Sequence, residues 1–238
     1  MDYQNLHPWS VSPVEAVQIQ HRLRPKLILN RAPKKIKMIA GIDVSFQRGS
    51  NRLYAAIVVL GLDQDNSKQR SMKPSPFHVD EKVTASLEVD FPYIPGLLSF
   101  REIPVVLKAW EKLKTRPDCL ICDGQGIAHP RRFGLAAHLG LIVDLPTIGC
   151  GKTRLVGLYR EPGPVRGAYA PLVDRGETIG RVLRSRERVK PLFISPGHMM
   201  TQERAMEVIL SCQRGYRLPE PTRLAHQFVN QGRKGQWY

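Results

Sequence analysis

The feature that most constrains the fold is a change of hydrophobic period near residue 100. Before it, two stretches at 36–46 and 83–91 alternate apolar and polar residues, and between them lies an almost wholly apolar run at 53–62. Alternation with period two is typical of a half-buried strand, and a continuous apolar run is typical of a strand covered on both faces. The three segments therefore predict an antiparallel meander with the apolar run at its centre.

Beyond residue 100 the apolar residues recur at helical spacing, and helical and strand patterns alternate. The expected elements are a helix around 106–113, a buried strand in 118–124, a helix in 131–140, strands at 142–149 and 191–195, and helices at 202–213 and after Thr222. A further helix is expected at the start of the chain, where Ser12 and Glu15 form an S-P-x-E start signal. A meander that leads into β-α-β units has the element order of a ribonuclease H-like α/β fold, with a central mixed β-sheet flanked by helices.

Three segments lack a regular pattern. Residues 63–80 are polar, contain two prolines and are typical of a mobile loop, whereas 160–190 are rich in Gly, Pro and Arg. Residues 231–238 are expected to fray. Because neither an internal repeat nor a clean linker interrupts the 238 residues, we expect one domain.

The charge balance indicates the class of partner. Thirty-six Lys and Arg against 21 Asp and Glu give a net charge of +15, which favours binding to a polyanion such as nucleic acid. No apolar run reaches the length of a membrane span, and the first residues lack the pattern of a secretory signal. We therefore expect a cytoplasmic protein.

The four cysteines allow a disulfide or a zinc site to be considered, because Cys119 and Cys122 are spaced C-x-x-C. This pair lies in the buried strand pattern, and side chains three apart on a strand point to opposite faces, so they cannot chelate one ion. We expect reduced core thiols at these positions and at Cys150 and Cys212.

Two acidic residues are placed where adjacent strands can bring them together. Asp43 lies in the first strand pattern on the face opposite the apolar stripe, and Asp123 ends a buried strand just before Gly124. If these strands are neighbours, the carboxylates converge, and like charges at short range repel unless one is protonated or a cation lies between them. Oxygen ligands and a phosphate substrate favour Mg²⁺, with Mn²⁺ as the substitute.

Each acid also has a purely structural interpretation. Asp43 and Asp123 are residue types that cap turns, and Ser99 with Glu102 fits a capping box. Pro104 argues against this box, because beyond the first helical turn its missing N–H breaks a backbone bond, so we expect the regular helix to begin later. Glu88 and Asp90 are rival acids, but they lie on the polar side of a strand pattern, where solvation is expected.

Three stretches together resemble the motifs of the endonuclease V family, metal-dependent enzymes that nick DNA beside deaminated purines. They are GIDVSF with Asp43, FPYIPGLLSFRE with Glu102 and ICDGQGIAHPRR with Asp123, and the resemblance runs from about residue 9 to 229. It implies the ribonuclease H-like fold and a metal site formed by these three acids. It also implies that Lys152, in TIGCGKTRLVG, and His226, in PEPTRLAHQFVN, complete the catalytic group.

Lys152 and His226 have chemical roles that fit this resemblance. The lysine would stabilise charge on the attacked phosphate or hold the water nucleophile, and the histidine would hold that water or an outer-shell metal water. The alternatives are an ordinary phosphate-contacting lysine and a structural histidine. The surrounding GCGKT also resembles the end of an NTPase phosphate loop, but Pro146 stands where that loop needs Gly, which excludes this interpretation.

The resemblance further implies a wedge and a base pocket. In Pro92-Tyr93-Ile94-Pro95, the tyrosine would fill the gap left by an extruded base; the flanking prolines stiffen the loop, and stacking contributes about 1–3 kcal/mol per base. A buried core tyrosine is the alternative.

The extruded base is expected to enter a pocket formed by Leu98, Gly124, Gln125 and Gly126. Glycine allows the backbone to approach the base closely, and an N–H that faces O6 accepts hypoxanthine and rejects the adenine amino group. Many bacterial members of the family have His where this chain has Gln125, so the fine selectivity is left open.

Several basic residues are candidate phosphate contacts, with solvated charge as the alternative for each. Arg131 and Arg132 are favoured because they follow the pocket loop directly; the others are Lys34, Lys35, Lys37 and the basic residues of 181–190.

The expected function is therefore that of a monomeric Mg²⁺-dependent endonuclease in DNA repair. The resemblance implies a nick at the second phosphodiester bond 3′ to deoxyinosine, with 3′-hydroxyl and 5′-phosphate products. An endoribonuclease specific for inosine in RNA, and a noncatalytic nucleic-acid-binding protein on the same fold, are the alternatives.

Overall fold

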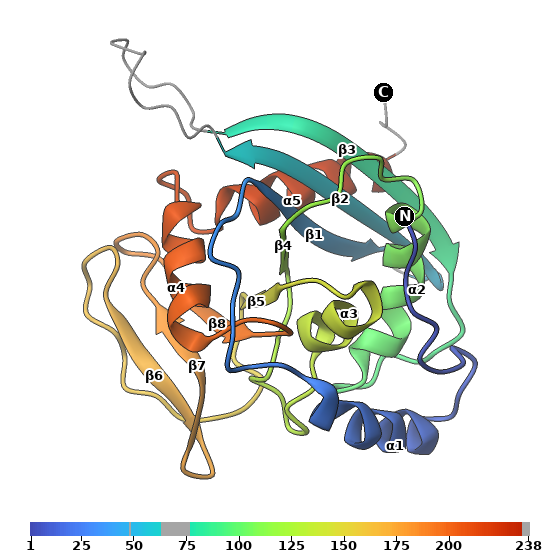
Figure 1. Cartoon of the computed structure of the whole chain (residues 1–238), viewed down its shortest axis with the longest axis horizontal. Helices are drawn as coiled ribbons and strands as arrows, with labels where there is room; N and C mark the ends of the chain where they lie inside the picture. Colours follow the sequence, from blue (N-terminus) through green and yellow to red (C-terminus); the bar gives the residue numbers. More distant parts are fainter. Residues whose placement is uncertain (48, 63–76, 235–238) are drawn as a thin grey trace.

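The computed structural model describes residues 1–47, 49–62 and 77–234. It contains an eight-stranded mixed sheet with helices on both faces (Figure 1). The strands are β1 (Met38–Phe46), β2 (Arg52–Leu62), β3 (Phe77–Glu88), β4 (Cys119–Cys122), β5 (Thr147–Gly151), β6 (Tyr169–Asp174), β7 (Glu177–Leu183) and β8 (Leu192–Pro196). The helices are α1 (Pro13–Leu23), a 3₁₀ turn η1 (Arg24–Lys26), α2 (Leu98–Trp110), α3 (Leu135–Val143), α4 (Gln202–Ser211) and α5 (Glu220–Arg233). This arrangement confirms the predicted ribonuclease H-like α/β class.

The strand order is β3-β2-β1-β4-β5-β8-β7-β6. The first three strands form the predicted antiparallel meander, with the apolar strand β2 between β1 and β3. Strands β4 and β5 then continue the sheet parallel to β1, and β8, β7 and β6 extend it in antiparallel pairs. The parallel trio β1, β4 and β5 occupies the middle of the sheet, where both faces are covered.

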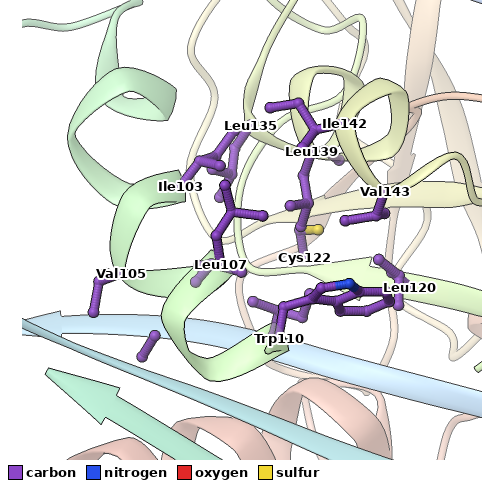
Figure 2. Packing of buried hydrophobic residues seen from close by; sticks show 14 of the residues in the cluster. Ile103, Val105, Leu107, Trp110, Leu120, Cys122, Leu135, Leu139, Ile142 and Val143 are labelled. Carbon is purple, nitrogen blue, oxygen red and sulfur yellow. The ribbon is translucent and has the colours of Figure 1, made fainter. Parts of the chain in front are cut away.

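Alternate residues of β1 pack into different cores. Ala40 and Ile42 join a large cluster with α1, α2 and α3, whereas Ile39 joins a second cluster with α4 and α5. Figure 2 shows the first of these clusters, where Trp110 of α2 packs with side chains of β4 and α3. Asp43 lies one residue beyond Ile42 and therefore points to the side of α5.

Helix α2 begins earlier than the sequence indicated. It spans Leu98–Trp110 and contains Pro104, so the expectation of a later start was wrong. The helix keeps its geometry despite the missing N–H because packing holds it on both sides of the proline: Ile103, Val105 and Val106 are fully buried. The capping box is absent, since Ser99 lies inside the helix and bonds His138 instead.

Other boundaries also differ from the predictions. Helix α3 continues to Val143, so the strand expected at 142–149 begins only at Thr147; a short apolar run does not distinguish a buried helix end from a strand. Strand β3 begins at Phe77, inside the predicted loop 63–80, whose residues 63–76 lie outside the described part of the chain. The segment 160–190 contains the hairpin β6–β7.

The C-terminal helix α5 also departs from expectation at both ends. It begins at Glu220 after the N-cap Pro219, so Thr222 is not the cap, and its hydroxyl donates to the Pro219 carbonyl at 3.1 Å. Residues 231–233 belong to this helix, although they were expected to fray, and 235–238 lie outside the described residues.

All four cysteines are buried free thiols, as predicted, and burial raises the pKa of the Cys212 thiol to about 12. Within the described ranges, no helix has the length and apolar character needed to cross a membrane.

Candidate active site

The pairing of β1 with β4 brings the first and third acids to the same level of the sheet. Ile42 pairs with Cys122 in parallel register, and the Asp123 N–H donates to the Ile42 carbonyl at 3.0 Å. Asp43 and Asp123 each follow one member of this pair. The two carboxylates therefore converge at the carboxyl ends of neighbouring parallel strands, where open α/β sheets bind ligands.

Gly41 allows α5 to approach this edge of the sheet. A Cβ at this position would lie 2.0 Å from the Pro221 carbonyl oxygen, so only glycine fits beneath the first turn of α5. The close approach places His226, in the second turn, over Asp43, and its Nδ1 lies 2.7 Å from Asp43 Oδ2. A small residue in the strand thus positions a functional residue on the helix.

The resulting group can bind a metal ion. One ligand atom from each of Asp43, Asp123 and His226 lies within 4.8 Å of the others. The Lys152 ammonium donates to Asp123 Oδ2 and lies 3.4 Å from His226 Nδ1. Asp43 is almost fully buried, whereas the His226 side chain is 45 % exposed, so the group opens to solvent on the histidine side.

Asn230 orients the histidine ring, although no sequence motif indicated it. Its Nδ2 lies 3.3 Å from His226 Nε2 and donates to the His226 carbonyl at 2.8 Å. This places the ring hydrogen on Nδ1, where it is donated to Asp43. The four-residue spacing of Asn230 from His226 on one helix is the signal that could have identified it.

Glu102 faces the same site from α2 without joining the three-residue group. Burial, and then the charges of Asp43 and Asp123, raise the pKa of its carboxyl to about 8. Burial and the Asp43 charge likewise raise the pKa of Asp123 to about 6, although Lys152 opposes this shift. In the acidic cluster, Asp43, Glu102 and Asp123, burial and neighbouring acids thus disfavour the charged form of Glu102 and Asp123, and a bound cation would favour it.

Part of the predicted wedge and most of the predicted pocket line one cavity with two of these acids. The cavity has a volume of about 550 Å³ and includes Tyr93, Leu98, Gly124 and Gln125 as well as Glu102, Asp123 and Lys152. Tyr93 is 66 % exposed, so it is not a core residue.

Gly126 is the predicted pocket residue that does not line this cavity. Its N–H donates to Ser195 Oγ at 2.9 Å, and a Cβ there would lie 1.9 Å from the Pro196 carbonyl oxygen. Gly126 therefore allows the loop after β4 to approach β8, and its N–H is not available to a base. This is a correction to the pocket predicted from the motif.

Gln125 does line the cavity. Its Nε2 donates to the Thr153 carbonyl at 2.9 Å, while among the described residues its Oε1 has no hydrogen-bond partner. A Cβ on Gly151 would lie 2.2 Å from Gln125 Nε2, so the glutamine conformation depends on that glycine.

Comparison with known proteins identifies the family. The chain matches Endonuclease V over residues 21–227. An Endonuclease V of Methanothrix thermoacetophila is 49 % identical over 226 residues, which cover 95 % of this chain and 94 % of the relative. The chain belongs to the endonuclease V family.

Solved structures agree with this assignment. Endonuclease V from Streptomyces avermitilis is 39 % identical and has a TM-score of 0.85, with 95 % of each chain covered. Endonuclease V from Ciona intestinalis is 25 % identical with a TM-score of 0.75, covers 93 % of this chain and 98 % of its own, and is in complex with a 24mer DNA containing an inosine followed by a ribo-adenosine. Membership of the endonuclease V family makes this chain a metal-dependent DNA-repair endonuclease that acts on phosphodiester bonds.

In this endonuclease V family member, Arg131 stabilises the loop that carries Tyr93, the predicted wedge. Its Nη2 donates to the Gly96 carbonyl at 2.7 Å, and its Nε donates to Gln20 Oε1 of α1. His129 Nε2 donates to the same carbonyl at 2.9 Å. The loop that carries Tyr93 is therefore bonded to the segment that follows the pocket.

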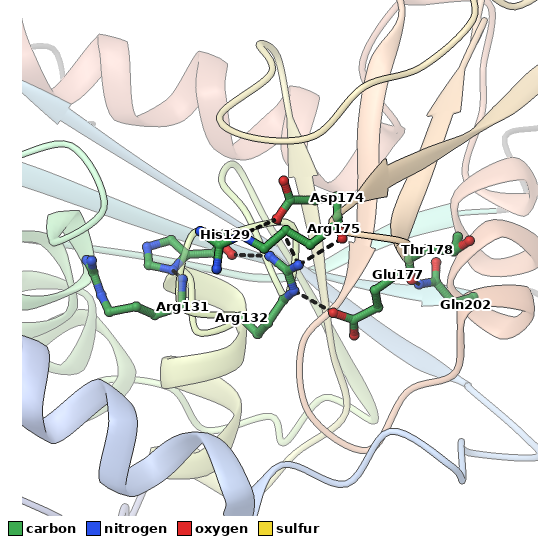
Figure 3. A network of polar contacts seen from close by, with 8 residues as sticks. All are labelled: His129, Arg131, Arg132, Asp174, Arg175, Glu177, Thr178 and Gln202. Atoms are coloured by element: carbon green, nitrogen blue, oxygen red, sulfur yellow. Dashed lines mark hydrogen bonds and ion pairs between the residues drawn. The ribbon is translucent and has the colours of Figure 1, made fainter.

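Arg132 has a structural role that its motif did not predict. Its Nη2 lies 2.8 Å from Asp174 Oδ2 and its Nε 2.7 Å from Glu177 Oε2, and Nη1 donates to the His129 carbonyl (Figure 3). The residue is only 8 % exposed. Its guanidinium joins the hairpin β6–β7 to the segment after β4 and is not available to a phosphate.

Proposed function

We propose that the protein is a Mg²⁺-dependent endonuclease that nicks DNA at the second phosphodiester bond 3′ to deoxyinosine, leaving 3′-hydroxyl and 5′-phosphate ends. The observation that carries the proposal is that Glu102 and Asp123 line one cavity with the exposed Tyr93, while Asp43 and His226 lie close to Asp123. The inosine-containing DNA bound by the Ciona relative supports the substrate. We further propose that the protein acts as a monomer in the cytoplasm.

The donor set fits a hard divalent cation. Asp43, Asp123 and Glu102 offer carboxylate oxygens, and burial, followed by the charges of the neighbouring acids, raises the pKa values of Asp123 and Glu102; a bound cation would oppose both effects. We assign these three residues to hold Mg²⁺, with Mn²⁺ as a substitute. When bound, such an ion polarises the phosphate and lowers the pKa of a bound water.

The basic residues of the site have separate roles. The Lys152 ammonium bonds Asp123 and is only partly buried, so it also presents positive charge to a phosphate that approaches the acids. The hydrogen on His226 Nδ1 is donated to Asp43, which orients the exposed ring, and Nε2 would hold the attacking water in exchange for its 3.3 Å contact with Asn230. Asn230 stabilises this orientation from the same helix.

The wedge loop and the pocket would select the nucleotide. Tyr93 lies between Pro92 and Pro95, and the loop end at Gly96 is bonded by Arg131 and His129, so insertion of the ring costs little conformational entropy. Leu98 would then pack on the extruded base, while the backbone around Gly124 and Gln125 reads its 6-oxo edge.

The decisive experiment is a nicking assay on a 5′-labelled duplex with a single deoxyinosine, in Mg²⁺ and in chelator. We expect a single product that ends one nucleotide beyond the inosine, and no product in chelator. A protein that shifts the duplex in a gel but never cuts it would be a noncatalytic binder, and the proposal would fail.

Inosine in RNA is a second candidate substrate, because the Ciona relative binds DNA with a ribo-adenosine after the inosine. The same assay on matched DNA, RNA and chimeric strands ranks the substrates by their single-turnover rates.

A further inference from the structure

A strongly basic groove adjoins the acidic cluster on the side of β8. It has a volume of about 810 Å³, and its walls come from residues 152–161 and 184–193. The cationic side chains that line it are those of Lys152, Arg154, Arg184, Arg188 and Lys190. The proposed function uses only Lys152 of this set.

Arg184 stabilises the wall of the groove. Its Nη2 bonds Glu161 Oε1 at 2.5 Å, and its Nη1 donates to the Val189 carbonyl, so the acidic residue of the groove is neutralised within the wall. Arg154, Arg188 and Lys190 are exposed, and in the described part of the chain none of them has an acidic partner. Three cations are therefore available to a ligand.

The floor of the groove is aromatic. The Arg154 guanidinium lies over the Tyr159 ring, 5.8 Å from its centroid, and this ring packs edge-on against Phe193 at 5.5 Å. Cationic side chains next to aromatic rings suit a nucleic-acid strand, because the cations can contact phosphates and the rings can contact sugars and bases.

Arg217 connects this groove to the catalytic lysine. Its Nη2 donates to the Lys152 carbonyl at 2.7 Å and to the Pro191 carbonyl at 3.0 Å, and its Nε donates to the Lys190 carbonyl at 2.8 Å. Residues 152–154 line both the groove and the cavity that holds the acids. A strand that crosses the acidic cluster can therefore continue directly into the groove.

We propose that this groove binds the backbone of the cut strand on the 3′ side of the scissile bond, and holds the 5′-phosphate strand after cleavage. The proposal rests on the proposed function, which places the base in the Tyr93 cavity and the cut 3′ to it. Because residues 152–154 line both the base cavity and the groove, we assign the strand that leaves the acids past Lys152 to the 3′ side of the cut, and the trimmed substrates below test this polarity.

The test compares two triple variants with equal charge changes. Arg154→Ala/Arg188→Ala/Lys190→Ala removes the free cations of the groove, and Lys108→Ala/Lys112→Ala/Lys114→Ala removes three exposed lysines around the end of α2. Binding to inosine duplexes is measured by fluorescence anisotropy over a salt series in chelator, and nicking rates are measured in Mg²⁺. Three inosine duplexes are used. The first has long DNA on both sides of the inosine, the second has its 5′ flank shortened, and the third has its 3′ flank shortened to just beyond the cut.

We expect the groove variant to lose about tenfold or more in affinity for substrates with a long 3′ flank, and the magnitude of its salt slope to fall by about 2–3. The variant and the wild type should bind the 3′-trimmed substrate equally. The groove assignment would be overturned if the groove variant lost the same affinity for both trimmed substrates, or lost no more affinity than the lysine control. Either result would leave the proposed inosine nicking intact. Absence of inosine nicking by the wild type would overturn the proposed function instead.

Discussion

The segment that follows β4 contributes charged residues to two polar sites whose charges are balanced in different ways. Asp123 enters the acidic cluster, where burial and like charges raise carboxyl pKa values. Nine residues later, Arg132 enters a network in which Asp174 and Glu177 neutralise its guanidinium (Figure 3). The first centre is the one that we propose binds a metal ion, whereas ion pairs within the fold balance the charge of the second. A charged residue is thus available for function where its partners leave it facing a cavity, as at Asp123, and is unavailable where they enclose it, as at Arg132.

The largest effect is expected at the acidic cluster. Asp43→Ala or Asp123→Ala should reduce nicking by about 1,000-fold or more, because each change removes an oxygen that we propose binds the metal. The metal-free variants should unfold at no less denaturant than the wild type, since each also removes a repelling charge. Single-turnover nicking and urea unfolding in chelator measure the two effects. Turnover at the wild-type rate by either variant would refute the site.

The next largest effect is expected at the Arg132 network, where the free energy of unfolding should depend on pH through His129. Burial, together with the nearby Arg131 and Arg132 charges, lowers the pKa of His129 to about 4 from an ordinary value of 6.5. Between these values the unfolded chain binds a proton that the folded protein does not, so stability falls as the pH drops from 6.5 to 4, by about 3 kcal/mol in all.

The variant His129→Gln isolates this contribution, because its amide can still donate to the Gly96 carbonyl and does not titrate. Its free energy of unfolding, measured by urea at pH 7, 5.5 and 4.5, should fall less steeply with acid than that of the wild type. Parallel curves would show that the acid sensitivity arises elsewhere, for example at the buried His7 and His138 pair, whose pKa values are also lowered by burial.

Arg132 should affect stability and leave the chemistry of the folded protein unchanged. Arg132 has a left-handed φ of 55°, which Asn tolerates, so Arg132→Asn removes the ion pairs with little added backbone strain. We expect a loss of about 1–3 kcal/mol, since Asp174 and Glu177 are partly exposed and can be hydrated. The nicking rate per folded molecule should stay near that of the wild type. A large loss of nicking rate with unchanged stability would show instead that Arg132 contacts a phosphate of the substrate.

This contrast shows what the sequence could and could not predict. The meander, the β-α-β order and the convergence of Asp43 with Asp123 follow from local periodicity and strand adjacency, and the structure has them. The partners of Arg132 lie 42 and 45 positions away, in a segment without a clear period. Pairing over that distance is decided by tertiary packing, so the same two-arginine motif gave no sign of its structural role.

The predicted helix boundaries were wrong for a related reason. Pro104 and the apolar end of α3 carry local signals that buried contacts override, as at Ile103 and Val106. Gly126 likewise belongs to a glycine-rich motif that suggests a base pocket, but its backbone contacts are made with β8, which lies some 70 residues later in the chain. In each example the residue type could be read from the sequence, but the distant residues that it contacts could not.

The smallest effect is expected at Tyr93, whose loop joins the two centres: it lines the acid cavity and is bonded by Arg131 and His129. Tyr93→Ala should weaken inosine selection in duplex DNA by about tenfold and in single strands by less, because less unstacking must be offset there. Tyr3→Ala, at another exposed tyrosine far from the cavity, is the matched control. Arg131→Ala should give the same pattern in weaker form, since it loosens the loop and leaves the ring in place. Equal losses on duplex and single strands would show that Tyr93 contacts the base itself and does not act as a wedge.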